Sequence, residues 1–317
     1  MNPHVYHRWA HPSSILFATE LPANERAFSF ALAQARSAGA RLIIFHAYDT
    51  LVVSASETSG VRYYDYAAAA RTEIQHLEPW AERARAVGVE CELVVQQGLA
   101  PQLILECARE KHVDRIVVGT RCPGALGKIL VGSVAEEVLR QADVPVLTIG
   151  PEVADLAPQA FKPRNILAAT SLNGHAAATG ALAAELAAAD GAKLVLMHVI
   201  HPDRSVEELA HTTVAQMEGN LKSMVPDSLL SRVDAEVLVI PGEPAEEILF
   251  QAKSHHVDLL ILGAQEASVF STLTRHGIVY RILGHSPCPV LTLSSRALQS
   301  VREPAEAGEE RQLARSV

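Results

Sequence analysis

GTRCPGALGKILVGS, from Gly119 to Ser133, joins two segments of different pattern. The apolar run 116–118 before it indicates a buried strand, and residues 134–140 after it have helical periodicity. Glycines let a backbone approach a ligand closely, and unpaired N–H groups at a helix start attract anions. We expect the Ser133 hydroxyl to cap the helix. The stretch therefore predicts a phosphate-binding loop. The alternative is an ordinary strand-to-helix connection in which glycines only provide the turn.

The segments around this loop occur twice in the chain. Val113–Gly119 (VDRIVVG) recurs 144 residues later as VDLLILG, and Val144–Thr148 recurs as Cys288–Thr292 at the same offset. Ile15–Thr19 recurs 151 residues later as Ile166–Thr170. A repeat of this kind predicts two domains of one fold, which agrees with a length of 317 residues.

The repeat divides the chain into five parts. We expect an N-terminal extension (1–11), a first domain (12–150), a linker (151–163), a second domain (164–296) and a polar tail (297–317). Disorder is the favoured interpretation of the extension, and fraying or weak helix that of the tail from about Gln299. If His4, His7 and His11 formed one helical face, their spacing would suggest a metal site.

Within each domain, short runs rich in Val, Ile and Leu alternate with segments rich in Ala, Glu and Arg. The expected strands are 15–19, 41–47, 90–96, 115–119 and 145–150, then 165–170, 193–200, 235–240, 259–263 and 290–293. The expected helices are 24–38, 66–87, 101–111 and 133–141, then 174–189, 205–224, 245–254 and 277–284. This order predicts two doubly wound α/β domains, whose ligands lie at the carboxyl ends of the strands where strand order reverses.

Composition restricts the partners and the compartment. The net charge of −9 argues against a nucleic-acid binder, and no run approaches the about 18 apolar residues of a membrane span. The four cysteines form no CxxC pair, and no secretory signal is evident, so a cytoplasmic location is expected. Cys122, beside Arg121, is expected to be the most reactive thiol.

The two strand–glycine-loop units, the segment GSVAEEVL and the PVL that follows resemble the universal stress protein family over residues 12–296. The family pattern is glycine, two residues, glycine, nine residues, then glycine with serine or threonine. Gly119 and Gly132-Ser133 match it, whereas Cys122 replaces the middle glycine. The resemblance implies five-stranded parallel sheets of order 3-2-1-4-5 with helices on both faces. It also implies dimerisation through the last strand, which in one chain becomes a pseudo-dimer of the two halves; whether two chains then associate as a homodimer is left open.

The resemblance further implies an adenine nucleotide, ATP or a related one with or without Mg²⁺, in the first domain. In the family, loop amides and the terminal Gly-Ser hold phosphates, and an aspartate after the first strand serves the nucleoside. Glu20 stands at that aspartate position, and Arg121 could neutralise phosphate. The implied site comprises Ala18, Thr19, Glu20, Ala47, Val118, Gly119, Arg121, Cys122, Gly132, Ser133 and Val134.

The second domain departs further from the pattern. Glu266 takes the middle place, His276-Gly277 stands at the last, and Ser171 replaces the carboxylate. A carboxylate in the loop repels phosphate, so we expect this domain to have lost phosphate binding.

The function predicted from these features is a cytoplasmic stress-response protein that binds an adenine nucleotide for regulation. The alternatives are a non-nucleotide interaction module and a slow ATP hydrolase. No Walker A loop is present and Ser133 has no identifiable base, so no catalytic residue is assigned. His46 and His198, which end matching apolar runs, are expected to be strand-end or core histidines rather than ligands.

Overall fold

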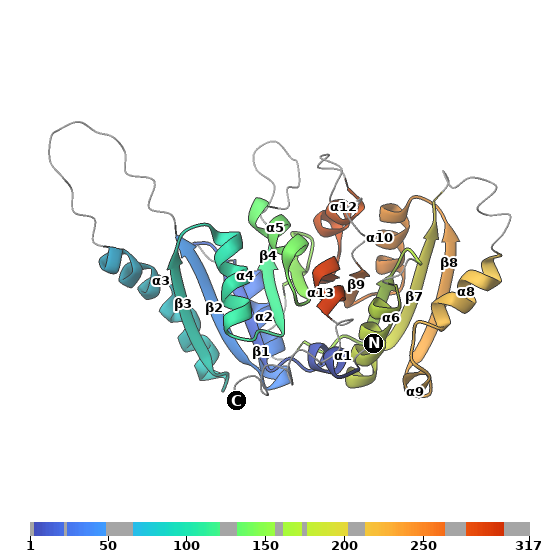
Figure 1. Cartoon of the computed structure of the whole chain (residues 1–317), viewed down its shortest axis with the longest axis horizontal. Helices are drawn as coiled ribbons and strands as arrows, with labels where there is room; N and C mark the ends of the chain where they lie inside the picture. The colour runs from blue at the N-terminus through green and yellow to red at the C-terminus, as the bar shows by residue number, and fades with distance from the viewer. Residues whose placement is uncertain are drawn as a thin grey trace, which may run out of the picture.

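The computed structural model describes residues 3–21, 24–48, 66–120, 132–155, 161–172, 176–201, 213–263 and 277–300 (Figure 1). The first half contains β1 (Ser14–Thr19), α2 (Glu25–Ala38), β2 (Arg41–Tyr48), α3 (Tyr66–Ala86), β3 (Cys91–Gln97), α4 (Ala100–Glu110), β4 (Arg115–Gly119), α5 (Ser133–Gln141) and β5 (Val146–Ile149). The second half contains β6 (Asn165–Ala169), α6 (Ala176–Asp190), β7 (Lys193–Ile200), α8 (Val214–Lys222), α9 (Asp227–Leu230), β8 (Asp234–Pro241), α10 (Pro244–Ser254), β9 (Leu259–Gly263), α12 (Ile278–His285) and β10 (Val290–Leu293). Helix α1 (Pro3–Ala10) precedes the first half, and α13 (Ser295–Ser300) follows the second. The predicted alternation of strands and helices is confirmed.

All ten strands form one sheet, in the order β3-β2-β1-β4-β5-β10-β9-β6-β7-β8. Each half is parallel and has the predicted order 3-2-1-4-5. The halves join through β5 and β10, which run antiparallel with Leu147 opposite Leu291. The predicted intrachain pseudo-dimer is therefore confirmed, and each half covers what would be the other's free sheet edge.

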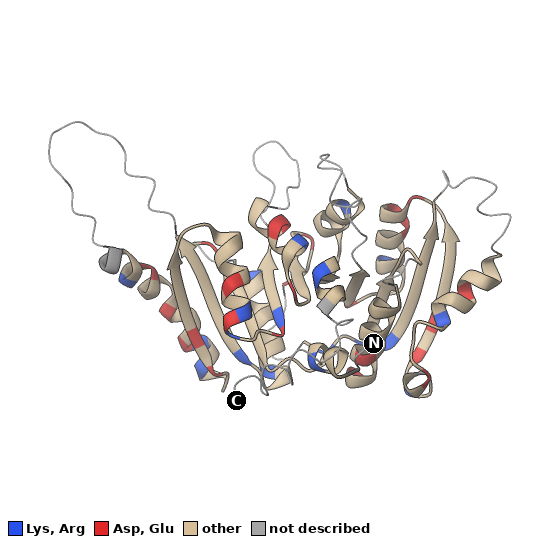
Figure 2. Cartoon of the chain, viewed as in Figure 1, with Lys and Arg blue, Asp and Glu red and all other residues tan. Residues whose placement is uncertain are grey.

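Two apolar layers cover the sheet, and each layer runs through both halves. On one face the strands pack against Phe28 of α2, Leu77 of α3 and Leu182 of α6. On the other face they pack against helices α4, α5, α10 and α12, with Val138 and Ile282 in the contact. Because both faces are covered, the strands read as continuous apolar runs, and Figure 2 shows most charged residues on the helices and loops rather than on the strands.

An aspartate that accepts backbone hydrogen bonds, buried in the first half and partly exposed in the second, explains the repeated Val-Asp pair before the fourth strand. The Asp114 carboxylate accepts hydrogen bonds from the backbone N–H groups of Ser13 and Ser14, at 2.7 and 3.1 Å. Asp258 accepts equivalent bonds from Arg164 and Asn165, at 2.8 and 3.0 Å. Each aspartate therefore ties the start of the fourth strand to the start of the first.

The N-terminal extension is helical, so the expectation of disorder there was wrong. Helix α1 packs against α6 of the second half and buries Tyr6 and Trp9. The buried Arg115 guanidinium donates to the backbone oxygen of Trp9 at 2.5 Å, and Arg8 pairs with Asp114 at 2.9 Å. The sequence reasoning missed this helix because its main packing partner, α6, lies in the other half of the chain.

The histidines of α1 are not part of a recognisable metal centre. His7 and His11 have ring centroids 4.5 Å apart, and His7 Nδ1 lies 3.9 Å from the Glu185 carboxylate. No group of three or more metal-ligating side chains occurs within the described residues. None of the helices in that part of the chain has the length and apolar character needed to cross a membrane.

Helix α13 extends the packed structure beyond residue 296. Ala297 and Leu298 are almost fully buried, and α13 contacts α5 of the first half. The Ser294 hydroxyl, just before the helix, accepts from the Ala297 N–H at 2.9 Å and donates to the backbone oxygen of Ala142. The first residues assigned to the polar tail therefore belong to the junction between the halves.

Candidate functional site

The first-half crevice lies at the carboxyl ends of β1 and β4. These strands are neighbours, with Ala18 opposite Val118, and strand order reverses between them. On the other side of β1, Thr19 pairs with His46 at the end of β2. Helix α5 begins at the same edge of the sheet, close to the end of β4 (Figure 1). Ligands of open α/β sheets bind at such a point.

The predicted site residues in the described part of the chain are brought to this edge. Ala18 and Val118 are buried in the strands, so they can offer a ligand little but backbone; Thr19, Ala47, Gly119 and Gly132 are partly exposed; and Glu20, Ser133 and Val134 are exposed. Arg121 and Cys122, with the rest of the loop at 121–131, lie outside the described residues, and so does the expectation about the reactivity of Cys122.

Gly119 is needed for packing as well as for any ligand. A Cβ added at Gly119 would overlap the amide nitrogen of Asn24, and it would lie 2.9 Å from the Asn24 Cγ and 3.2 Å from the Cβ of Ala27. The missing side chain therefore lets the first turn of α2 come close to the end of β4. The sequence analysis assigned this glycine to a ligand or to a turn and missed its packing role, because the approach of α2 is not visible in the sequence.

The start of α5 differs in one detail from expectation. Gly132 is the N-cap residue, with φ −62° and ψ 150°, and no side chain caps the helix there. Ser133 is the first helical residue and is exposed, so the expectation that its hydroxyl caps α5 was wrong. A cap must come from the residue before the helix, and Ser133 lies one position too late. The first-turn N–H groups and the positive end of the helix dipole form the kind of surface that attracts an anion.

A histidine holds the end of the first strand in each half. His46 Nδ1 lies 3.0 Å from the backbone oxygen of Thr19, and His198 Nδ1 lies 2.8 Å from that of Thr170. Both histidines are buried, in agreement with their assignment as strand-end residues. In the first half, His46 Nε2 also lies 3.8 Å from the Glu73 carboxylate of α3. The imidazole thus fixes the turn that carries Thr19 and Glu20.

The second-half crevice keeps the backbone of a helix N-terminus. Gly277 is the N-cap of α12, with φ −61° and ψ 151°, nearly the values of Gly132. The buried residues Val279, Ile282 and Leu283 of α12 match Ala135, Val138 and Leu139 of α5 at an offset of 144, so α12 begins one residue later than α5. Glu266 and His276, on which the expected loss of phosphate binding depends, lie outside the described residues.

The rims of the two crevices carry different chemistry. In the second half, Glu243 at the N-cap of α10 lies 3.3 Å from His201 Nε2 and accepts from Arg281 at 3.0 Å. Arg281 also donates to Glu246 at 3.0 Å. In the first half the N-cap of α4 is Leu99, which is 64% exposed. A charged network therefore stands where the first half presents an apolar side chain.

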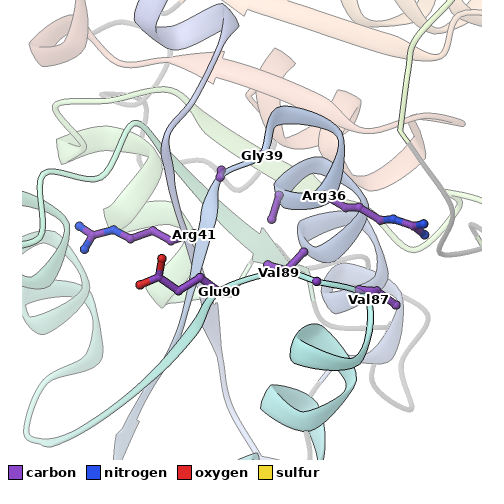
Figure 3. A pocket seen from close by; sticks show the side chains of 9 residues that line it. Arg36, Gly39, Arg41, Val87, Val89 and Glu90 are labelled. Carbon is purple, nitrogen blue, oxygen red and sulfur yellow. The ribbon is translucent and has the colours of Figure 1, made fainter.

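A separate hollow of about 270 Å³ lies at the opposite edge of the sheet, where β2 and β3 begin (Figure 3). Arg36, Arg41, Val89 and Glu90 are among its lining residues. The Arg41 guanidinium already donates to the Ser14 hydroxyl and to the backbone oxygen of Lys111. This hollow is remote from the residues predicted to bind a ligand.

Comparison with known proteins finds one family over both halves. A family model described as the universal stress protein family matches residues 13–150 and again 162–294. The chain is 33% identical over 126 residues to the Thermus aquaticus "Universal stress protein in QAH/OAS sulfhydrylase 3'region", covering 39% of this chain and 88% of that protein. It is 31% identical over 131 residues to universal stress protein YxiE of Bacillus subtilis, again covering 39% and 88%.

A solved structure matches the tandem arrangement. The crystal structure of a universal stress protein from Archaeoglobus fulgidus covers 92% of this chain and 98% of its own, with a TM-score of 0.66 and 19% identity, which shows the shared fold. Two other universal stress proteins have been solved in complex with dAMP and with cAMP. Both match this chain with a TM-score of 0.33, which is too low for their ligands to be assigned to this chain.

Proposed function

Because this chain belongs to the universal stress protein family, with two family domains in tandem, we propose that it is a regulatory protein that binds one adenine nucleotide, ATP or a related one, in its first half. The observation that carries the proposal is the meeting of three features at one sheet edge. These are the switch point between β1 and β4, the exposed Glu20 carboxylate after β1, and the glycine N-cap of α5.

The roles of the site residues follow from their chemistry. The phosphates would lie at the first turn of α5, where N–H groups and the helix dipole favour negative charge. A Cβ added at Gly132 would meet no atom of the described residues within 4 Å, which supports space for a ligand beside the start of this helix. The nucleoside would lie toward Thr19, Glu20 and Ala47, with Glu20 accepting from a ribose hydroxyl.

The second half has a different use in this proposal. The Glu243–Arg281–Glu246 network ties α10 to α12 and places carboxylates at the rim. Carboxylates near a phosphate site oppose anion binding. We therefore assign the second half to the stability of the pseudo-dimer and to regulation.

The test is the number of nucleotides bound per chain. Purified protein would be denatured and its small molecules identified by mass spectrometry, and the nucleotide-free chain would be titrated with ATP, with and without Mg²⁺, by calorimetry. One site per chain is the expected result. Two equivalent sites would contradict the assignment to the first half, and absence of binding to adenine nucleotides would favour the interaction module.

A further inference from the structure

Asn24 was not among the residues expected to form the site, yet its amide lies against the end of β4. It is the N-cap of α2, and its Oδ1 accepts the Ala27 N–H at 3.1 Å. Because the oxygen makes this bond, the other side of the amide is the nitrogen. The nitrogen is the atom that a Cβ on Gly119 would overlap. The cap thus fixes an N–H₂ group over the first glycine of the family pattern.

This amide nitrogen is available to a ligand. Within the described parts of the chain, no hydrogen bond uses Asn24 Nδ2, and the side chain is only partly exposed. A ligand oxygen would serve this donor as an acceptor in place of water. The charge nearest to it in sequence is compensated, because the Glu25 carboxylate is held by the Arg83 guanidinium at 2.5 and 3.0 Å.

The second half places a different group against the glycine at the end of its fourth strand. Thr179 of α6 lies against Gly263 as Ala27 of α2 lies against Gly119. The offset of 152 between these contacts also relates Gly39 to Gly191, the left-handed residues after each helix. At that offset the counterpart of Asn24 is Ala176, whose methyl group is buried. The close approach of the helix is therefore shared, but within the described residues the second half places the Thr179 hydroxyl, rather than an amide, against its glycine.

We propose that Asn24 determines the specificity of the first-half site, by donating from Nδ2 to a phosphate oxygen of the bound nucleotide. The inference rests on the proposed function and extends it. Hydrogen bonds to an anionic oxygen are stronger than those between neutral groups, and the first turn of α2 adds its own positive dipole end. Asn24 therefore favours phosphorylated nucleosides over free nucleosides.

The test separates the donor from the cap. Asn24→Ser and Asn24→Asp both retain a side-chain oxygen for the Ala27 N–H, whereas neither retains the amide donor. Calorimetry on the full chain with AMP and with adenosine should show AMP affinity reduced about fivefold in Asn24→Ser. The reduction should exceed about twentyfold in Asn24→Asp, where a carboxylate faces the phosphate. Adenosine affinity should stay within about twofold of wild type, and thermal unfolding should show the cap intact.

The outcomes distinguish a failure of the role of Asn24 from a failure of the proposed nucleotide site. If wild type binds AMP and both variants bind it equally well, the role of Asn24 is overturned and the nucleotide site stands. A parallel loss of AMP and adenosine affinity also overturns it, because the amide would then act on the nucleoside or on the fold. If wild type binds no adenine nucleotide, the proposed function and this inference fall together.

Discussion

The first and second halves share their strand order, and they differ in the polar groups set on it. Asn24, Leu99 and Arg115 of the first half have Ala176, Glu243 and Leu259 as their counterparts. The fold tolerates these exchanges because the apolar layers on both sheet faces, rather than the polar positions, hold each half together. One fold can therefore carry two crevices of different chemistry. Replacing residues of one half with their counterparts from the other tests which differences affect stability and which affect nucleotide binding.

The largest effect is expected when Arg115 is replaced by the leucine of the second half. Burial lowers the pKa of the Arg115 guanidinium to about 10. The guanidinium donates to Gln34 of α2 and to the Trp9 backbone oxygen of α1, and so ties α1 to the first half. Arg115→Leu should lower the free energy of unfolding by about 3 kcal/mol, because these acceptors lose a charged donor. Denaturant unfolding measures the loss, and limited proteolysis should show cleavage near α1.

The matched control is an exposed arginine. Arg85, whose side chain is 47% exposed in its pair with Glu78, should leave the free energy of unfolding close to that of wild type on replacement by leucine, because exposed ion pairs contribute little to stability. Equal stability of wild type and Arg115→Leu would show that α1 is held by its apolar face alone.

The two equivalent glycines should separate stability from binding. In Gly119→Ala the new methyl group displaces the Asn24 amide, and in Gly263→Ala it displaces the Thr179 hydroxyl. Each variant should lose about 2 kcal/mol of unfolding free energy through overpacking. Only Gly119→Ala should also weaken nucleotide binding, as measured by calorimetry. Equal losses of affinity in both variants would place ligand contacts in the second half as well.

Gly132→His copies His276 of the second half into the first. The imidazole adds bulk where the backbone must approach phosphate, so affinity for ATP should fall at least about tenfold, or roughly 1.4 kcal/mol. The substituent meets no protein atom near the Cβ position, and φ is negative, so stability should be unchanged. The converse change, His276→Gly, should restore little binding, because Glu266 and Ser171 are retained. Undiminished affinity in Gly132→His would show that the phosphates lie elsewhere.

The smallest effect concerns Cys288, which stands where the first half has Val144. Burial raises the pKa of the Cys288 thiol from 9.0 to about 11. Between these values the unfolded chain loses the proton and the folded chain keeps it, so stability falls as pH rises. Urea unfolding at pH 7.5 and pH 10 should show wild type losing about 1 kcal/mol more than Cys288→Val.

Two other thiols, the partly buried Cys91 and the buried Cys107, provide the baseline for this comparison. Burial raises the pKa values of Cys91 and Cys107 to about 11 as well, and both remain in the variant. Some alkaline loss of stability should therefore persist in Cys288→Val. An identical pH dependence in the two proteins would mean that the Cys288 thiol is equally protonated in the folded and unfolded chains.

The sequence by itself determined the alternation of strands and helices, the tandem repeat and the switch point that carries the candidate site. These depend on local periodicity and on order along the chain. It did not determine that Ser133 lies one residue too late to cap α5, because the boundary between extended and helical backbone is set within a single residue. Only the tertiary structure placed Asn24 over Gly119, Trp9 beside Arg115, and α1 on the second half. These contacts join residues about a hundred positions apart, or residues of different halves. They depend on the distance at which each helix packs against the sheet, which the local sequence does not specify.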